Sequence, residues 1–162
     1  MTNIENIISQ ALLNKNLTVS VAESCTGGLV SSRLTDVSGS SAYIKLNLVT
    51  YSNEAKIKML GVSPDSLKKF GAVSEQVALE MAKGVRILSE TDIGLGITGI
   101  AGPTGGTPQK PVGLVYIAIA SENRNEVYKV NINPDLPRTE IKYQASEHAL
   151  ELLSAFILID KL

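Results

Sequence analysis

Residues 17–28 read LTVSVAESCTGG, and this stretch decides the fold. Apolar Leu17, Val19 and Val21 alternate with polar residues, which predicts a strand. The glycine-rich turn that follows leads into the apolar spacing of a short helix over 29–34. In open α/β sheets, ligands bind where strands end and the next segment begins. The turn at 22–28 is therefore the first candidate for a site.

The rest of the chain continues this alternation of strand and helix patterns. Helical spacing or helix start signals predict helices over 3–15, over 53–60, from Ser63-Pro64, from Ser74 and over 138–158. In the helix from Ser74 we expect a buried stripe of Val77, Met81, Val85 and Leu88. Strand patterns cover 43–51, 92–98, 112–120 and 126–132, with a hairpin turn at 122–125. We expect one α/β domain over 1–162, a three-layer α/β/α sandwich with a mixed, mostly parallel sheet.

Composition narrows the class of protein. The chain has 162 residues, 44% hydrophobic and 19% charged, with a net charge of −1, so a globular fold is expected and duplex nucleic acid is a poor partner. A single cysteine excludes an intramolecular disulfide and a multi-cysteine zinc site, and no metal or other cofactor is expected. The sequence begins without a signal-peptide pattern and has no apolar run long enough for a membrane span, so we expect a cytoplasmic protein.

The turn at 22–28 offers two nucleophiles side by side, Ser24 and Cys25. Gly27 and Gly28 would let the backbone approach a ligand, and the following helix N-terminus would offer N–H groups to a phosphate or an oxyanion. The alternative is a tight turn in which Ser or Thr merely caps the next helix.

A base for a serine nucleophile must come from elsewhere in the chain. The only histidine, His148, falls in the middle of the last predicted helix, so a structural or surface role suits it better. Tyr51 ends a predicted strand and Lys56 lies about one helical turn later, so a phenol and an amine could converge on Ser24. The alternative places Lys56 on a solvated helix face.

Two further segments could contact a ligand. The glycine-rich stretch 98–108 is either a wall of the pocket or a long flexible connection. Arg138, at the start of the last helix, could clamp a phosphate or could be an ordinary surface charge.

These segments occur together in one order: Ala22 to Gly28, Val49 to Lys56, Gly71 to Ser74, Thr98 to Pro103, and Lys110 to Gly113. The set resembles the C-terminal domain of the competence/damage-inducible CinA proteins, a family that includes stand-alone nicotinamide-nucleotide amidohydrolases (PncC). The resemblance implies hydrolysis of the carboxamide of nicotinamide mononucleotide to nicotinate mononucleotide and ammonia. It also implies a homodimer or a higher homo-oligomer. A non-catalytic nucleotide-binding or regulatory module, acting through a protein partner, is the alternative.

The resemblance also assigns roles to residues of this sequence. Its catalytic group falls on Ser24, Tyr51 and Lys56. From these residues we expect Lys56 to take the serine proton, directly or relayed by Tyr51, and the amides of residues 25–28 to hold the oxyanion. Its substrate-binding residues are Glu23, Cys25, Thr26, Gly27, Gly28, Asn53, Thr98, Gly99, Ala101, Gly102 and Arg138. Two stretches depart from the family pattern. Where the family usually has Gly-Asp-Arg before the last helix, this chain has Asp135-Leu136-Pro137-Arg138. Where the family has small residues before Val49, this chain has Leu46-Asn47-Leu48.

Overall fold

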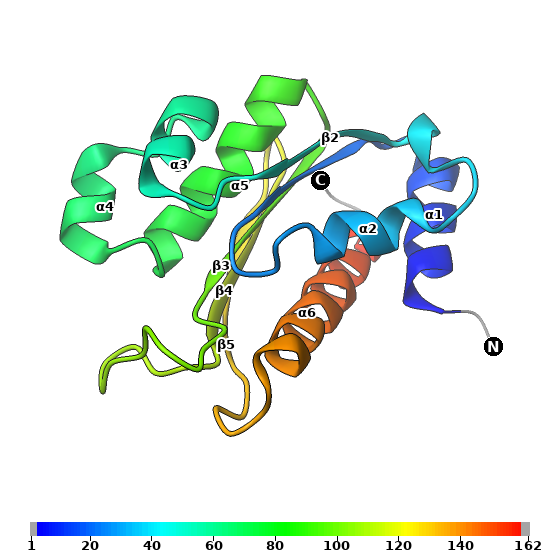
Figure 1. Ribbon diagram of the computed structural model, residues 1–162. Coiled ribbons are helices and arrows are strands. Elements are labelled where there is room, and N and C mark those ends of the chain that lie inside the picture. The colour runs from blue at the N-terminus through cyan, green and yellow to red at the C-terminus, as the bar shows by residue number, and fades with distance from the viewer. Residues whose placement is uncertain (1–2, 160–162) are drawn as a thin grey trace.

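The computed structural model describes residues 3–159, and the remaining residues of the predicted domain, 1–2 and 160–162, lie outside this range. One mixed sheet forms the centre (Figure 1). Its strands are β1 (Val19–Glu23), β2 (Ile44–Val49), β3 (Ile93–Gly99), β4 (Leu114–Ala120) and β5 (Asn125–Asn131). The helices are α1 (Ile4–Lys15), α2 (Leu29–Thr35), α3 (Asn53–Leu60), α4 (Pro64–Phe70), α5 (Glu75–Ser89) and α6 (Arg138–Leu158), with a 3-10 turn at Ser40–Ala42.

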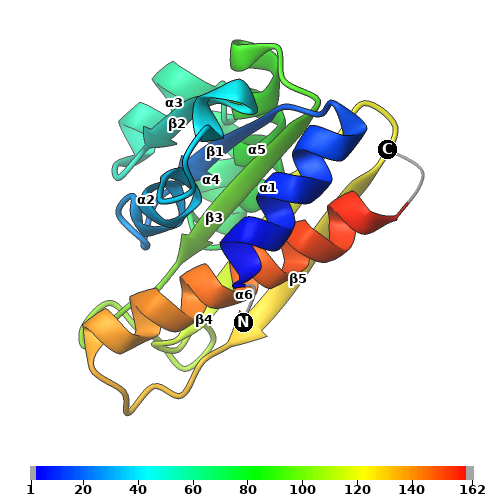
Figure 2. The same cartoon turned by 90° about the vertical axis from the view of Figure 1, so that its right-hand side faces the viewer.

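The strand order is β2-β1-β3-β4-β5. β1 is parallel to both β2 and β3, whereas β4 is antiparallel to β3 and to β5. Only β4 therefore runs against the other four strands, and the predicted mixed, mostly parallel sheet is confirmed. In Figure 1, helices α3, α4 and α5 lie on one side of the sheet and α1, α2 and α6 on the other, and Figure 2 shows α1 and α6 crossing the second face. The predicted three layers are confirmed.

The two faces of the sheet differ in the size of their side chains. In β3, Ile93, Leu95 and Ile97 join the large core under α1 and α6, whereas Gly94 and Gly96 face α5. A Cβ at Gly94 would lie only 2.1 Å from the carbonyl oxygen of Ala82. The alternation of large residues with glycine in β3 therefore lets the backbone of α5 lie directly against the sheet.

Serine caps begin the helices on the α5 side. Ser52, Ser63 and Ser74 accept from the backbone N–H groups of Ala55, Ser66 and Val77, respectively. The predicted starts at Ser63-Pro64 and at Ser74 are confirmed, so the sequence correctly places α4 and α5 relative to the strand ends.

One predicted core position is wrong. Leu88 was expected in the buried stripe of α5, but its side chain is 50% exposed. Contact with the sheet ends near Arg86, whose Cβ lies over Gly94, so the last turn of α5 extends past the strands that cover it. The buried stripe is instead Val77, Ala78, Met81, Ala82 and Val85.

Candidate active site

A pocket of about 270 Å³ opens where β1, β2 and β3 end. Parallel strands present their carboxyl ends at one edge, which brings together residues far apart in the sequence, such as Ser24 and Gly99, 75 positions later. Ten of the predicted site residues line it: Ser24, Cys25, Tyr51, Asn53, Lys56, Thr98, Gly99, Ala101, Gly102 and Arg138. The other four, Glu23, Thr26, Gly27 and Gly28, do not.

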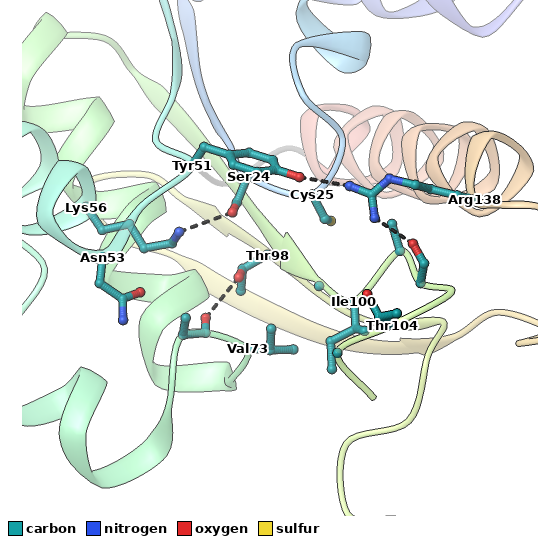
Figure 3. Close-up of a pocket in the computed structure, with 15 residues that line it drawn as sticks. Ser24, Cys25, Tyr51, Asn53, Lys56, Val73, Thr98, Ile100, Thr104 and Arg138 are labelled. Atoms are coloured by element: carbon teal, nitrogen blue, oxygen red, sulfur yellow. Dashed lines mark hydrogen bonds between the residues drawn. The ribbon is translucent and has the colours of Figure 1, made fainter. Parts of the chain in front are cut away.

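Ser24 and Lys56 meet directly in this pocket. The Nζ of Lys56 donates to the Oγ of Ser24 at 3.1 Å and to the carbonyl oxygen of Thr50 at 2.9 Å (Figure 3). Lys56 is 2% exposed, and no ion pair involves it within residues 3–159. Burial lowers the pKa of its ammonium from the ordinary value of 10.5. A buried lysine that gives up its proton more easily is suited to act as a base towards serine.

Tyr51 does not connect Lys56 with Ser24, contrary to the expected relay. Its hydroxyl accepts from Nη2 of Arg138 at 2.8 Å, and Nη1 of Arg138 donates to the carbonyl oxygen of Gly102 at 2.6 Å. In Figure 3 the Tyr51 hydroxyl is directed to Arg138. Tyr51 and Arg138 therefore bridge the pocket from the end of β2 to the glycine-rich segment.

The prediction that the amides of residues 25–28 are all free to bind a ligand is wrong for Gly27 and Gly28. The amide of Gly28 donates to Oε2 of Glu23 at 3.0 Å, and the amide of Gly27 donates to the carbonyl oxygen of Ser24 at 3.0 Å. Glu23 is fully buried, so it contacts this loop rather than the pocket. Within the described chain, the amides of Cys25 and Thr26 donate to no other residue, which makes these two the loop's candidates for an oxyanion.

Thr26, Gly27 and Gly28 line a second hollow on the other side of the loop, together with Thr139 and Lys142. The buried hydroxyl of Thr26 donates to Glu23. These three residues therefore shape the loop that carries Ser24, and their side chains and Cα atoms lie away from the pocket around Lys56.

Cys25 is the rival nucleophile, and its surroundings disfavour it. The side chain is 7% exposed, and its sulfur would lie 3.1 Å from a Cβ at Gly99. Burial, and next the negative charge of Glu23, raise the pKa of the Cys25 thiol to about 12. Because the thiolate is the reactive form, this environment favours Ser24.

The glycine-rich segment is a wall of the pocket. Its first part is tied to β4 by hydrogen bonds between Ile100 and Leu114 at 2.9 Å and between Gly113 and Ile100 at 2.8 Å. The hydroxyl of Thr98 donates to the carbonyl oxygen of Ala72 at 2.9 Å. The ammonium of Lys110 donates to the carbonyl oxygen of Phe70. The long connection is thus held at both ends.

Five lining residues were missed as site residues: Ala72, Val73, Ile100, Thr104 and Gly105. Three of them lie in the glycine-rich segment that was expected to be a wall. Ala72 and Val73 lie in the Gly71–Ser74 motif, which entered the resemblance without a role. The motif was the sequence signal that could have indicated these two residues. In the structure its Ala72 carbonyl oxygen accepts from the hydroxyl of Thr98, which holds the motif against the pocket.

Among residues 3–159, no group of three or more His, Cys, Asp or Glu side chains could hold a metal ion. His148 is partly exposed on α6, where Nδ1 lies 3.7 Å from a carboxylate oxygen of Glu151. The helices of this same range include none long and apolar enough to cross a membrane.

Comparison with known proteins shows the family of this chain. The sequence model of the CinA C-terminal domain matches residues 1–157. The chain belongs to this family. A CinA-like protein of Kosmotoga olearia is 48% identical over 156 residues, which are 96% of this chain and 37% of that protein. This CinA domain therefore spans about a third of the length of that curated relative.

Solved structures of the family match along most of their length. The crystal structure of competence/damage inducible protein CihA from Agrobacterium tumefaciens has a TM-score of 0.89 and 43% identity, covering 96% of each chain. That of competence damage-inducible protein A (ComA) from Klebsiella pneumoniae subsp. pneumoniae MGH 78578 has a TM-score of 0.92 and 29% identity, covering 99% of this chain and 100% of that one. Both support the CinA fold found here.

Proposed function

We propose that this CinA domain is an amidohydrolase that converts nicotinamide mononucleotide to nicotinate mononucleotide and ammonia. The observation that carries the proposal is the 3.1 Å hydrogen bond between the buried amine of Lys56 and the hydroxyl of Ser24. A serine with a base in contact is the arrangement that acyl transfer requires. The choice of substrate rests on the family resemblance.

The reaction would proceed in two halves. Neutral Lys56 takes the proton of Ser24 while Oγ attacks the carboxamide carbon, and the resulting oxyanion is held by the amides of Cys25 and Thr26. The C–N bond then breaks, Lys56 returns the proton to the departing ammonia, and an ester with Ser24 remains. Water, deprotonated by Lys56, cleaves this ester, releases the carboxylate and restores the Ser24 hydroxyl.

Release of ammonia by the purified protein tests this reaction. Ammonia should appear in equal amount with nicotinate mononucleotide, identified by mass spectrometry. Free nicotinamide is the control, because it has the same amide without the ribose phosphate. Binding of nicotinamide mononucleotide without ammonia release would favour the non-catalytic module instead, and release from free nicotinamide alone would move the proposal to another substrate.

Arg138 is expected to bind the phosphate of this substrate. Its guanidinium lines the pocket, where it donates to the Tyr51 hydroxyl and to the carbonyl oxygen of Gly102. A charge-assisted hydrogen bond to phosphate contributes about 1.5–3 kcal/mol. Arg138→Gln should therefore raise KM for nicotinamide mononucleotide about 10- to 100-fold and change kcat less.

The matched control for Arg138→Gln is nicotinamide riboside, which lacks the phosphate. Its KM should be the same with the wild type and with the variant. An equal rise in KM for both substrates would mean that Arg138 acts on the position of Tyr51 and not on phosphate.

A further inference from the structure

The carboxylate of Glu23 is surrounded by hydrogen-bond donors. Oε1 accepts from the amide of Ser31 at 2.8 Å and from its hydroxyl. Oε2 accepts from the amides of Gly28 at 3.0 Å and Val30 at 3.2 Å and from the hydroxyl of Thr26. The side chain has no exposed surface, so these five donors replace the water that the carboxylate loses.

This carboxylate substitutes for a missing helix cap. The N-cap residue of α2 is Gly28, which has no side chain to bind the free amides of the first turn. Glu23 supplies the acceptor from the end of β1, five residues earlier in the chain. Its negative charge lies at the positive end of α2, so strand, loop and helix are fixed together at this point.

Ser24 lies inside the segment that Glu23 fixes. Its carbonyl oxygen accepts from the amide of Gly27 at 3.0 Å, which closes the turn that leads to Thr26 and Gly28, two of the residues bound by the carboxylate. The conformation of Ser24 is thus set on one side by β1 and on the other by a turn that depends on Glu23.

The backbone of Glu23 also fixes the partner of Ser24. Its carbonyl oxygen accepts from the amide of Thr50 at 2.9 Å, and the carbonyl oxygen of Thr50 accepts from Nζ of Lys56 at 2.9 Å. One residue therefore connects the loop that carries the nucleophile with the residue that orients the base.

We infer that Glu23 is a positioning residue whose buried carboxylate holds the Ser24 loop so that Oγ faces Lys56. The inference rests on the proposed function in that it assigns a role within the same site. Glu23 contacts neither the pocket nor Lys56, so it acts through Ser24 and not on the substrate.

Glu23→Gln tests the role with little change in shape. The amide nitrogen of glutamine is itself a donor, so it cannot accept from the N–H and O–H groups that now face the carboxylate. Since a displacement of about 1 Å at a reacting group can cost about 100-fold in rate, kcat should fall about 10- to 100-fold. KM should change less than about twofold, because the residues lining the pocket are unaltered.

Glu5→Gln is the matched control for lost stability. Glu5 is also a buried carboxylate, 8% exposed, and it accepts from Nε of Arg33 at 2.8 Å, away from the pocket. Both variants should unfold at lower urea concentration, and only Glu23→Gln should lose kcat. A Glu23→Gln enzyme with wild-type kcat, or a Glu5→Gln enzyme with the same loss, would overturn the inference.

Crystal structures of the two variants decide the point without any substrate. In Glu23→Gln the Lys56 Nζ and Ser24 Oγ atoms should separate beyond hydrogen-bonding distance, whereas in Glu5→Gln they should stay bonded. An unchanged distance in Glu23→Gln would overturn the positioning role. If the wild type released no ammonia, the proposed function would fail while this comparison still tested Glu23.

Discussion

Ser24→Ala is expected to lower ammonia release by at least about 1,000-fold and to leave the protein folded. In the proposed reaction the Oγ of Ser24 forms the bond to the carboxamide carbon. The other hydrogen-bond acceptor of the Lys56 Nζ, the carbonyl oxygen of Thr50, is not a nucleophile. The substitution removes one hydrogen bond, so the free energy of unfolding should change by about 1 kcal/mol or less. Steady-state ammonia release and urea unfolding of both proteins check the prediction.

Cys25→Ala is the control for Ser24→Ala. The thiol, with its pKa raised to about 12, is almost entirely protonated at neutral pH, so its loss should cost packing rather than chemistry. We expect kcat within about tenfold of the wild type and a stability loss of about 1 kcal/mol. An inactive Cys25→Ala protein beside an active Ser24→Ala protein would reverse the assignment of the nucleophile.

The sheet was predictable because its determinants are local. The alternation in Ile93-Gly94-Leu95-Gly96-Ile97 predicts a strand, and the same alternation decides which face takes the large core and which takes α5. Ser63-Pro64 and Ser74 predict helix starts for a reason equally local, since a cap side chain binds an amide three residues later. Leu88 has the right spacing but lies beyond the end of the sheet, and spacing carries no information on where a sheet ends.

The contacts of the site were less predictable because they join distant segments. A Ser–Lys pair followed from the lack of a suitable histidine, and the structure brings Ser24 and Lys56 together across 32 positions. The hydrogen bond between Arg138 and Tyr51 spans 87 positions. Nothing in either segment indicates that the Tyr51 hydroxyl would bind Arg138 rather than Lys56. Glu23 shows a third limit: a polar residue at a strand end suits a ligand contact or a helix cap equally well until the direction of its side chain is known.

Lys56→Met is expected to lower kcat by about 100- to 10,000-fold, the range that a positioned general base contributes. Methionine has a similar length and no proton to exchange, so Ser24 would keep its place and lose its base. The wild-type rate should rise with pH as Lys56 loses its proton and should level off below pH 10.5, because burial lowers the pKa of this lysine. The residual rate of Lys56→Met should lack that rise. A variant with the same pH profile as the wild type would show that another group takes the serine proton.

The same lysine links activity to stability, with a sign that can be worked out. In the unfolded chain Lys56 keeps its proton up to about its ordinary pKa, whereas in the folded protein it releases the proton at lower pH. Between the two pKa values the unfolded state binds more protons, so the free energy of unfolding rises with pH across this window. Below the folded pKa, Lys56 is buried with its charge, and this burial lowers the free energy of unfolding by its full amount. Methionine carries no charge and has no such cost.

Urea unfolding of the wild type and Lys56→Met, at about pH 7 and at about pH 10, measures this cost. At about pH 7 the variant should be more stable by about 1–2 kcal/mol, since the gain from removing a buried charge exceeds the loss of the hydrogen bond to Thr50. At about pH 10 the difference should shrink, because so close to the ordinary pKa of 10.5 it costs little free energy to remove the proton from the unfolded lysine. A wild type that is more stable than Lys56→Met at both pH values would mean that the hydrogen bonds of Lys56 to Ser24 and Thr50 outweigh its burial. In that case the amine would have no strong tendency to lose its proton, and its role as the base would lose its physical ground.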